Sequence, residues 1–150
     1  METKDGGEIV NMDKGFLLLK NYAQRRLGGK VDEVARRMTA DPRLTAADRM
    51  RLLRELESCW RFNTHRELAL AASKQEPENV TLQLEAVAAN LRFDAKRGAI
   101  KILLAAGHQD ARETIRLLMK DHRFDQLLEE EPRVVEHLQK LAEAVESEPP

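Results

Sequence analysis

The chain has 150 residues, of which 34% are charged and 42% are apolar, and its formal net charge is −1. The longest apolar stretches, such as Phe16–Leu19, are far shorter than the roughly 20 residues that cross a bilayer, so a membrane-spanning protein is excluded. Cys59 is the single cysteine, which excludes an intramolecular disulfide and a multi-cysteine zinc site. Together with a polar, acidic start that lacks a secretory signal, this favours a cytoplasmic protein.

The first third of the chain predicts two helices. Residues 1–12 contain Gly6–Gly7 and little apolar content, which indicates a flexible N-terminal segment. Asp13 is expected to cap a helix from about Lys14 to Leu27, which Gly28–Gly29 would end. A shorter helix with Val31, Val34, Ala35 and Met38 should follow and end before Asp41 and Pro42.

The clearest helix begins after Thr45. Thr45 and Asp48 have the spacing of a capping box, and the apolar residues that follow form one stripe with Leu53, Leu56 and Trp60. We place Cys59 beside Trp60 as a small core residue. Asn63–Thr64 then predict a turn and a new cap, and a return helix over about 67–74.

The remaining elements carry similar local signals. Asn79 should cap the next helix, Phe93–Asp94 should form a turn, and the return helix from about residue 95 should end at Gly107. Asp110 should begin another helix, and Pro132 fits the first position of the last one. Residues 147–150 are expected to form a frayed tail.

Apolar residues nearly repeat along the middle of the chain. Leu53, Leu56, Trp60, Ala69 and Pro77 are followed roughly 30 residues later by Leu84, Val87, Leu91, Ala99 and Gly107, and such a period is typical of stacked helical hairpins. We therefore predict one all-α domain over residues 13–146. Its seven to nine helices should form antiparallel hairpins, stacked as a short right-handed repeat or as an irregular bundle.

These hairpins resemble the tetratricopeptide repeat family, whose unit is a helical hairpin of roughly 34 residues. The residues that match its pattern are Leu84, Val87, Ala88 and Leu91, and in the preceding hairpin Leu53, Leu56, Trp60 and Ala69. Glu57 departs from the pattern where the family has a small residue. The resemblance implies a protein-binding scaffold without catalysis, and a groove lined by the first helix of each hairpin. Carried over, the partner-binding residues are Arg51, Arg54, Ser58, Arg61, Glu85 and Arg92.

Charge supports a basic binding surface in the first half of the chain. Residues 14–66 carry 13 Lys and Arg against 6 Asp and Glu. Arginine suits bidentate binding of carboxylate or phosphate, so an acidic or amphipathic helical segment of a partner protein is the expected ligand. Nucleic acid is the alternative ligand, although aromatic residues for base stacking are few. A self-associating structural domain is a third interpretation, using apolar surface such as Val134–Val145.

No pattern of catalytic or metal-binding residues stands out. None of the four histidines lies three or four residues from another, which is the usual ligand spacing on a helix. Cys59 has no base at a suggestive spacing, and Gly28–Gly29 is no phosphate-binding loop. The sequence therefore predicts a non-enzymatic adaptor with no catalytic residue, no metal and no cofactor.

Overall fold

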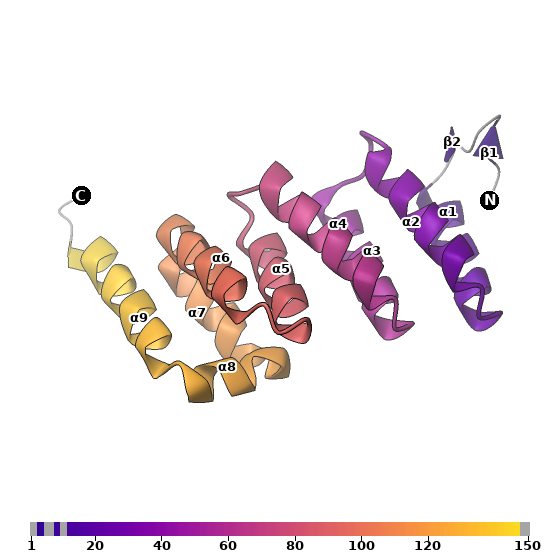
Figure 1. The fold of residues 1–150 in the computed structure, drawn as a ribbon. Helices are drawn as coiled ribbons and strands as arrows, with labels where there is room; N and C mark the ends of the chain where they lie inside the picture. The colour runs from indigo at the N-terminus through magenta and orange to yellow at the C-terminus, as the bar shows by residue number, and fades with distance from the viewer. Residues whose placement is uncertain (1–2, 5–7, 10–11, 148–150) are drawn as a thin grey trace. The chain divides into compact units, whose positions relative to one another are not determined.

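The protein is all-α. The structure, a computed structural model, describes residues 3–4, 8–9 and 12–147, in which nine α-helices and one 3₁₀ turn follow one another (Figure 1). Two-residue strands β1 (Thr3–Lys4) and β2 (Glu8–Ile9) pair antiparallel ahead of the first helix, where we predicted a flexible segment. Met12 of the predicted flexible segment begins the first helix and Ser147 of the predicted tail ends the last one, whereas residues 1–2, 5–7, 10–11 and 148–150 lie outside the described residues.

The chain divides into two compact units, residues 1–68 and 69–150. The boundary falls inside helix α4 (Phe62–Gln75) and not in a glycine- or proline-rich linker. Each unit is described by itself below, and the single domain over residues 13–146 stays a prediction.

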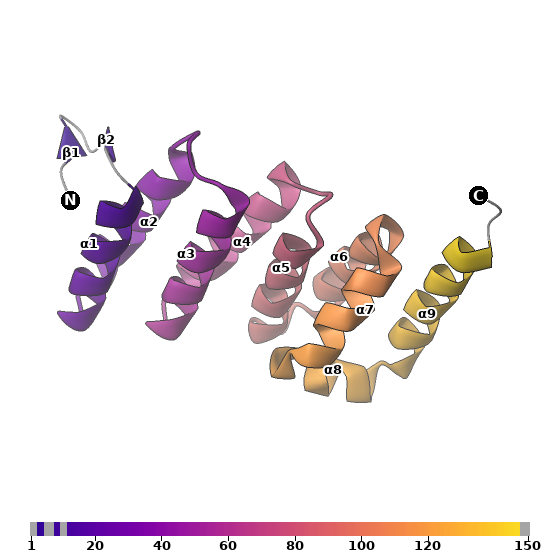
Figure 2. The same cartoon turned by 180° about the vertical axis from the view of Figure 1, so that it is seen from behind.

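The first unit is built from paired helices α1 (Met12–Gln24) and α2 (Gly28–Ala40), followed by α3 (Ala46–Ser58) and the start of α4. Helices α1 and α2 lie side by side in both views (Figures 1 and 2). Gly15 permits their close approach, because a Cβ atom there would lie 3.0 Å from the sulfur of buried Met38. The apolar side chains buried in these helices include Phe16, Leu19, Val31, Val34, Ala35, Leu53 and Leu56.

Four of the helix starts that we predicted are confirmed, whereas Asp13 is not a cap, because α1 already begins at Met12. Thr45 Oγ1 accepts from the Asp48 amide at 3.1 Å while the Asp48 carboxylate accepts from the Thr45 amide at 3.2 Å, which completes the capping box of α3. Asn79 and Asp110 accept from the backbone amides of residues 82 and 113, and Pro132 is the first residue of the last helix. Short-range hydrogen bonding thus sets where these helices begin.

The first helix of each pair ends in the same turn, and the three turns are evenly spaced along the chain. Arg26, Trp60 and Asp94 have φ values of 57°, 64° and 57°, and the residue after each donates to the carbonyl five positions back at 2.8–2.9 Å. This is the Schellman motif, with a left-handed residue just beyond the helix. Helices α1, α3 and α5 accordingly begin at the equally spaced residues 12, 46 and 80.

The observed positions of the helices correct further sequence predictions. The interval between the starts of α3 and α5 is longer than the one that we predicted for the middle of the chain, so the counterpart of Trp60 is Asp94 and not Leu91. Gly28–Gly29 do not end α1 but begin α2. Thr64 is no cap, since α4 already begins at Phe62 and buries the Thr64 side chain.

The second unit contains the end of α4 and the remaining helices. Its elements are α5 (Val80–Arg92), α6 (Lys96–Gln109), α7 (Ala111–Lys120), the 3₁₀ turn η1 (His122–Phe124), α8 (Asp125–Glu130) and α9 (Pro132–Ser147). Helix α5 packs against α6 and α7, and α9 packs against α6 and α7. The shared core includes Leu84, Val87, Leu103, Leu118, Phe124, Leu127 and Leu138.

Helix α5 is buried on all sides from Leu82 to Asn90, so its polar side chains need partners. Gln83 Nε2 donates to the carbonyl oxygens of Ser73 and Glu76 at 2.9 and 3.0 Å, and Gln83 Oε1 accepts from Ser73 Oγ at 2.6 Å. The side chain of Gln83 therefore donates to carbonyls at and just beyond the C-terminal end of α4, where the helix itself supplies no donors.

Gly107 was expected to end a helix, but α6 continues to Gln109. Its role is instead to let α6 approach α9, because a Cβ atom at residue 107 would lie 2.2 Å from Cδ2 of Leu138. Leu138 is fully buried in the core.

We predict that Gly107→Ala lowers the free energy of unfolding by about 2 kcal/mol, the usual cost of overpacking a core. The matched variant is Gly98→Ala in the same helix, where the nearest atom is Asn90 Nδ2 at 3.3 Å. Urea unfolding followed by circular dichroism should show a smaller loss for Gly98→Ala. Equal stability of the two variants would contradict the assigned close approach.

Candidate functional site

The exposed side of α3 carries three of the residues that we predicted to bind a partner. Arg51, Arg54 and Ser58 follow one another at helical spacing and all three are exposed or partly exposed. The Arg51 guanidinium carbon lies 3.9 Å above the ring centroid of Phe16 in α1, so Arg51 lies against the neighbouring helix. Ser58 Oγ donates to the Glu55 carbonyl at 2.9 Å. The structure thus brings Arg51, Arg54 and Ser58 together on one helix side.

Helix α1 extends this surface. Leu17 is 66% exposed although it is a large apolar residue, and Lys20 is exposed one turn further along α1. Leu17 and Lys20 precede Arg51 and Arg54 by the interval that separates the starts of α1 and α3, so they hold the equivalent positions on the neighbouring helix. We call the surface formed by Leu17, Lys20, Arg51, Arg54 and Ser58 the α1–α3 face.

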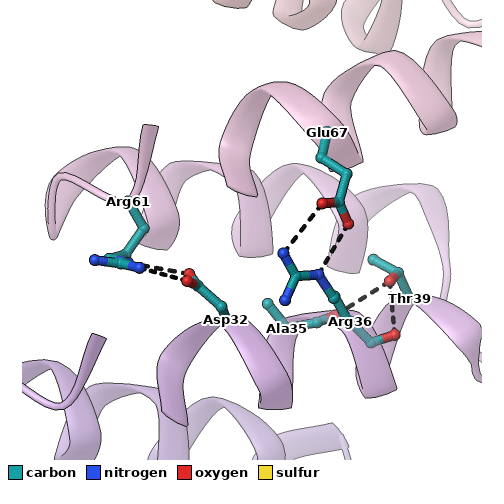
Figure 3. Close-up of polar contacts among 6 residues, drawn as sticks. All are labelled: Asp32, Ala35, Arg36, Thr39, Arg61 and Glu67. Atoms are coloured by element: carbon teal, nitrogen blue, oxygen red, sulfur yellow. Dashed lines mark hydrogen bonds and ion pairs between the residues drawn. The ribbon is translucent and has the colours of Figure 1, made fainter. Parts of the chain in front are cut away.

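Several other arginines of the first unit are already paired with carboxylates. Arg36 binds Glu67 through two hydrogen bonds of 2.9 and 3.1 Å (Figure 3). The other pairs are Arg37 with Glu33, Arg43 with Asp41, and Arg61 with Asp32. Within the part of the chain that the structure describes, Lys20, Arg51 and Arg54 have no carboxylate partner. Part of the positive charge that the sequence places in residues 14–66 is therefore left uncompensated on the α1–α3 face.

Arg61 pairs with a carboxylate inside the first unit. Its guanidinium forms a two-pronged contact with Asp32 of α2, with Nε at 3.0 Å from Oδ1 (Figure 3). Its head also lies where a side chain at Gly28 would be, since a Cβ atom there would be 2.5 Å from Nη1 of Arg61. The Arg61 side chain therefore points to α2, whereas the Arg51 side chain points to α1. The pairing of Arg61 with Asp32 lies within the first unit.

The Asp32 carboxylate is stabilised in its charged form. Burial acts to raise the pKa of Asp32, but the hydrogen bonds from Arg61 and Thr64 outweigh this effect. The pKa consequently lies below its ordinary value of 3.8. At the nearby loop, the hydrogen bonds from Arg43 lower the pKa of Asp41 to about 2.

The two remaining predicted residues, Glu85 and Arg92, belong to the second unit. Glu85 is only 2% exposed and binds Arg123 of η1 through two hydrogen bonds of 2.8 and 3.0 Å. Arg92 lies at the end of α5 and lines an open hollow of about 400 Å³. A partner-binding role for Arg51, Arg54, Ser58, Arg61, Glu85 and Arg92 stays a prediction.

The hollow beside Arg92 combines apolar and charged walls. Ala88, Leu91 and Leu127 line it with apolar atoms. Its cations are held in place, because Arg123 binds Asp121 at 2.7 Å as well as Glu85, and Lys96 lies 3.2 and 2.9 Å from Glu130 and Glu131. The hollow thus has a size typical of ligand pockets, but its charges are largely compensated within the unit.

Sequence reasoning did not anticipate the exposure of Trp60. We placed it on the apolar stripe of α3, but the helix ends at Ser58 and the Trp60 side chain is 80% exposed. Cys59, expected to be a small core residue, is half-buried, and burial raises the pKa of its thiol. The sequence does not predict that Trp60 has a left-handed backbone conformation, because glycine or asparagine usually occupies this position beyond a helix end.

No family model, curated protein or solved structure matches this chain. Among the described residues, no helix is long and apolar enough to cross a lipid bilayer.

We predict that Asp32→Asn lowers the free energy of unfolding by about 1 kcal/mol at pH 7, because it weakens a partly exposed ion pair. The pKa of Asp32 is lowered on folding, so this stabilisation is present above the unfolded-state pKa and is lost as the pH falls through the folded one. The difference between wild type and variant should therefore shrink below about pH 4. Urea titrations at several pH values would test this, with Glu136→Gln as an exposed control. A difference independent of pH would contradict it.

We also predict opposite effects at two adjacent glycines. Gly28→Ala should displace the Arg61 head from Asp32 and cost about 1 kcal/mol, whereas Gly29→Ala, with no atom within 4 Å of the new Cβ, should stabilise α2 by about 0.5 kcal/mol. In Gly28→Ala/Asp32→Asn, the two costs should not add, because both remove the same contact. Additive costs in thermal or urea unfolding would show that Gly28 acts independently of Arg61.

Proposed function

We propose that this protein is a non-enzymatic scaffold that binds an acidic segment or an amphipathic helix of a partner protein on the α1–α3 face. The observation that supports this most directly is the uncompensated charge of Lys20, Arg51 and Arg54 beside exposed Leu17. A cytoplasmic location and the absence of a cofactor, both predicted from the sequence, remain part of the proposal.

The chemistry of the α1–α3 face suits such a ligand. Arg51 and Arg54 offer planar, bidentate donors for carboxylates, and Leu17 offers an apolar contact next to them. Each exposed ion pair contributes little alone, about 0–1 kcal/mol, so affinity requires several carboxylates together with the apolar contact. An amphipathic helix with acidic residues beside a leucine meets both requirements.

The resemblance to tetratricopeptide repeats is also part of this proposal. The helix starts at residues 12, 46 and 80 recur at the length of that family's unit. In the family, the first helices of the hairpins line the ligand groove, and α1 and α3 hold this position in the first two hairpins. The resemblance therefore favours the same surface as the charge does.

The chemical state of Cys59, the residue that we considered as a nucleophile, supports a non-enzymatic role. A reactive cysteine has a lowered pKa, whereas burial raises the pKa of Cys59. Its thiol donates weakly to the Leu56 carbonyl at 3.5 Å. Cys59 is accordingly a partly buried packing residue in this proposal.

The test measures binding of a synthetic amphipathic helix with glutamates at helical spacing beside leucines. We expect Arg51→Glu/Arg54→Glu to weaken its affinity at least about ten-fold, because attraction becomes repulsion at two adjacent positions. Lys101→Glu/Lys140→Glu, which reverses two exposed lysines of the second unit, changes the net charge equally and should leave affinity nearly unchanged. Fluorescence anisotropy of the labelled peptide gives both values.

Two results would count against the proposal. One is a wild-type protein that does not bind the peptide, and the other is an equal loss of affinity in both charge-reversed variants. Circular dichroism confirms folding, which should be kept because neither Arg51 nor Arg54 pairs with a carboxylate among the described residues.

A further inference from the structure

Trp60 lies at a backbone position whose conformation disfavours a tryptophan. Its φ of 64° lies in the left-handed region, where a side chain other than glycine or asparagine is disfavoured. The equivalent residues of the other two turns, Arg26 and Asp94, are polar. The Trp60 side chain is 80% exposed and so contributes little to the core. An exposed tryptophan in a strained backbone position indicates a role in binding.

A small hollow of about 200 Å³ lies beside Trp60. It is formed by the turn between α1 and α2 and the turn between α3 and α4, both in the first unit, and its lining residues are Ala23, Arg26, Gly28, Val31, Cys59 and Arg61. Trp60 lies between two of these lining residues in the chain but does not itself line the hollow. The turn that carries Trp60 thus adjoins a space with two arginines in its wall.

Exposed cations lie on the turn between α1 and α2 and at the start of α2. Arg61 is compensated by Asp32, but the exposed Arg26 has no partner among the residues that the structure describes. Lys30 in the first turn of α2 is likewise exposed and has no described partner. The turns therefore combine one planar aromatic surface with cations that are free to bind an anion.

We propose that these turns bind single-stranded nucleic acid, with Trp60 stacking on a base and Arg26 and Lys30 contacting phosphates. Every base has a planar face for an indole, and its phosphate supplies the matching charge. An acidic peptide would use the arginines but leave Trp60 without a planar partner. A membrane surface fits less well, because the other large apolar side chain of the two turns, Leu27, is only 37% exposed. This site is separate from the α1–α3 face and does not depend on the function proposed for it.

The test uses the fact that Trp60 is the single tryptophan of the chain. Titration with an oligothymidylate of about 12 nucleotides should quench its fluorescence to saturation. With about two phosphates contacted, the logarithm of the association constant should fall with the logarithm of salt concentration at a slope near −1.4. Arg26→Glu/Lys30→Glu should weaken binding about ten-fold, while Lys101→Glu/Lys140→Glu should not.

Substitution of Trp60 separates binding from folding. Trp60→Gly should lower the affinity for a labelled oligothymidylate about ten-fold in anisotropy, whereas Trp60→Phe, which keeps a ring, should lose less. Since glycine suits the left-handed position, Trp60→Gly should unfold at an equal or higher urea concentration than wild type. It should also keep its affinity for the acidic amphipathic peptide of the α1–α3 face.

Three outcomes would overturn this assignment. The first is an oligonucleotide that does not quench Trp60, and the second is unchanged oligonucleotide affinity in Trp60→Gly. The third is a shift of Trp60 emission by phosphatidylserine-containing vesicles or by the acidic peptide but not by the oligonucleotide, which would assign the turns to a membrane or to a protein partner.

Discussion

The left-handed residue that ends α1, α3 and α5 is the constraint on which the rest of the structure depends. Each of these residues, Arg26, Trp60 and Asp94, redirects the chain so that the next helix begins two residues later. The accompanying backbone hydrogen bonds satisfy carbonyls at the helix end that would otherwise lack partners. The first helices all have 13 residues, and the one-residue difference between α2 and α4 is offset by the connections that follow them, 41–45 and 76–79. The helix pairs therefore recur at a constant interval although their sequences differ widely.

Residues at equivalent positions of α1, α3 and α5 differ in their chemistry. Leu17, Arg51 and Glu85 are equivalent in this recurrence, yet the first two are exposed and the third is buried with Arg123 as its partner. A buried carboxylate without a cation would be very costly, so Glu85 requires Arg123. The repeated backbone thus determines the position of a residue on its helix, whereas the surrounding side chains determine whether its side chain is available for binding. This is why uncompensated arginines gather on α3 and not on every hairpin.

Local signals in the sequence were sufficient for the helix starts at Thr45, Asn79, Asp110 and Pro132, because a cap depends on residues three positions apart. The interval predicted for the middle of the chain, between the starts of α3 and α5, was too short for a physical reason. The predicted and observed intervals differ by nearly one helical turn, so apolar stripes superimpose almost equally well at both spacings. The pairing of Arg61 with Asp32 depends on tertiary structure, and no local sequence pattern predicts it.

The solvent exposure of Trp60 has a spectroscopic consequence. In most proteins an indole moves from an apolar interior to water on unfolding, and its emission reports the transition. Here the single indole is already in water in the native state, so global unfolding should change the wavelength of its emission very little. Far-ultraviolet ellipticity reports the stability of this helical protein, whereas its intrinsic fluorescence is a local probe of one turn.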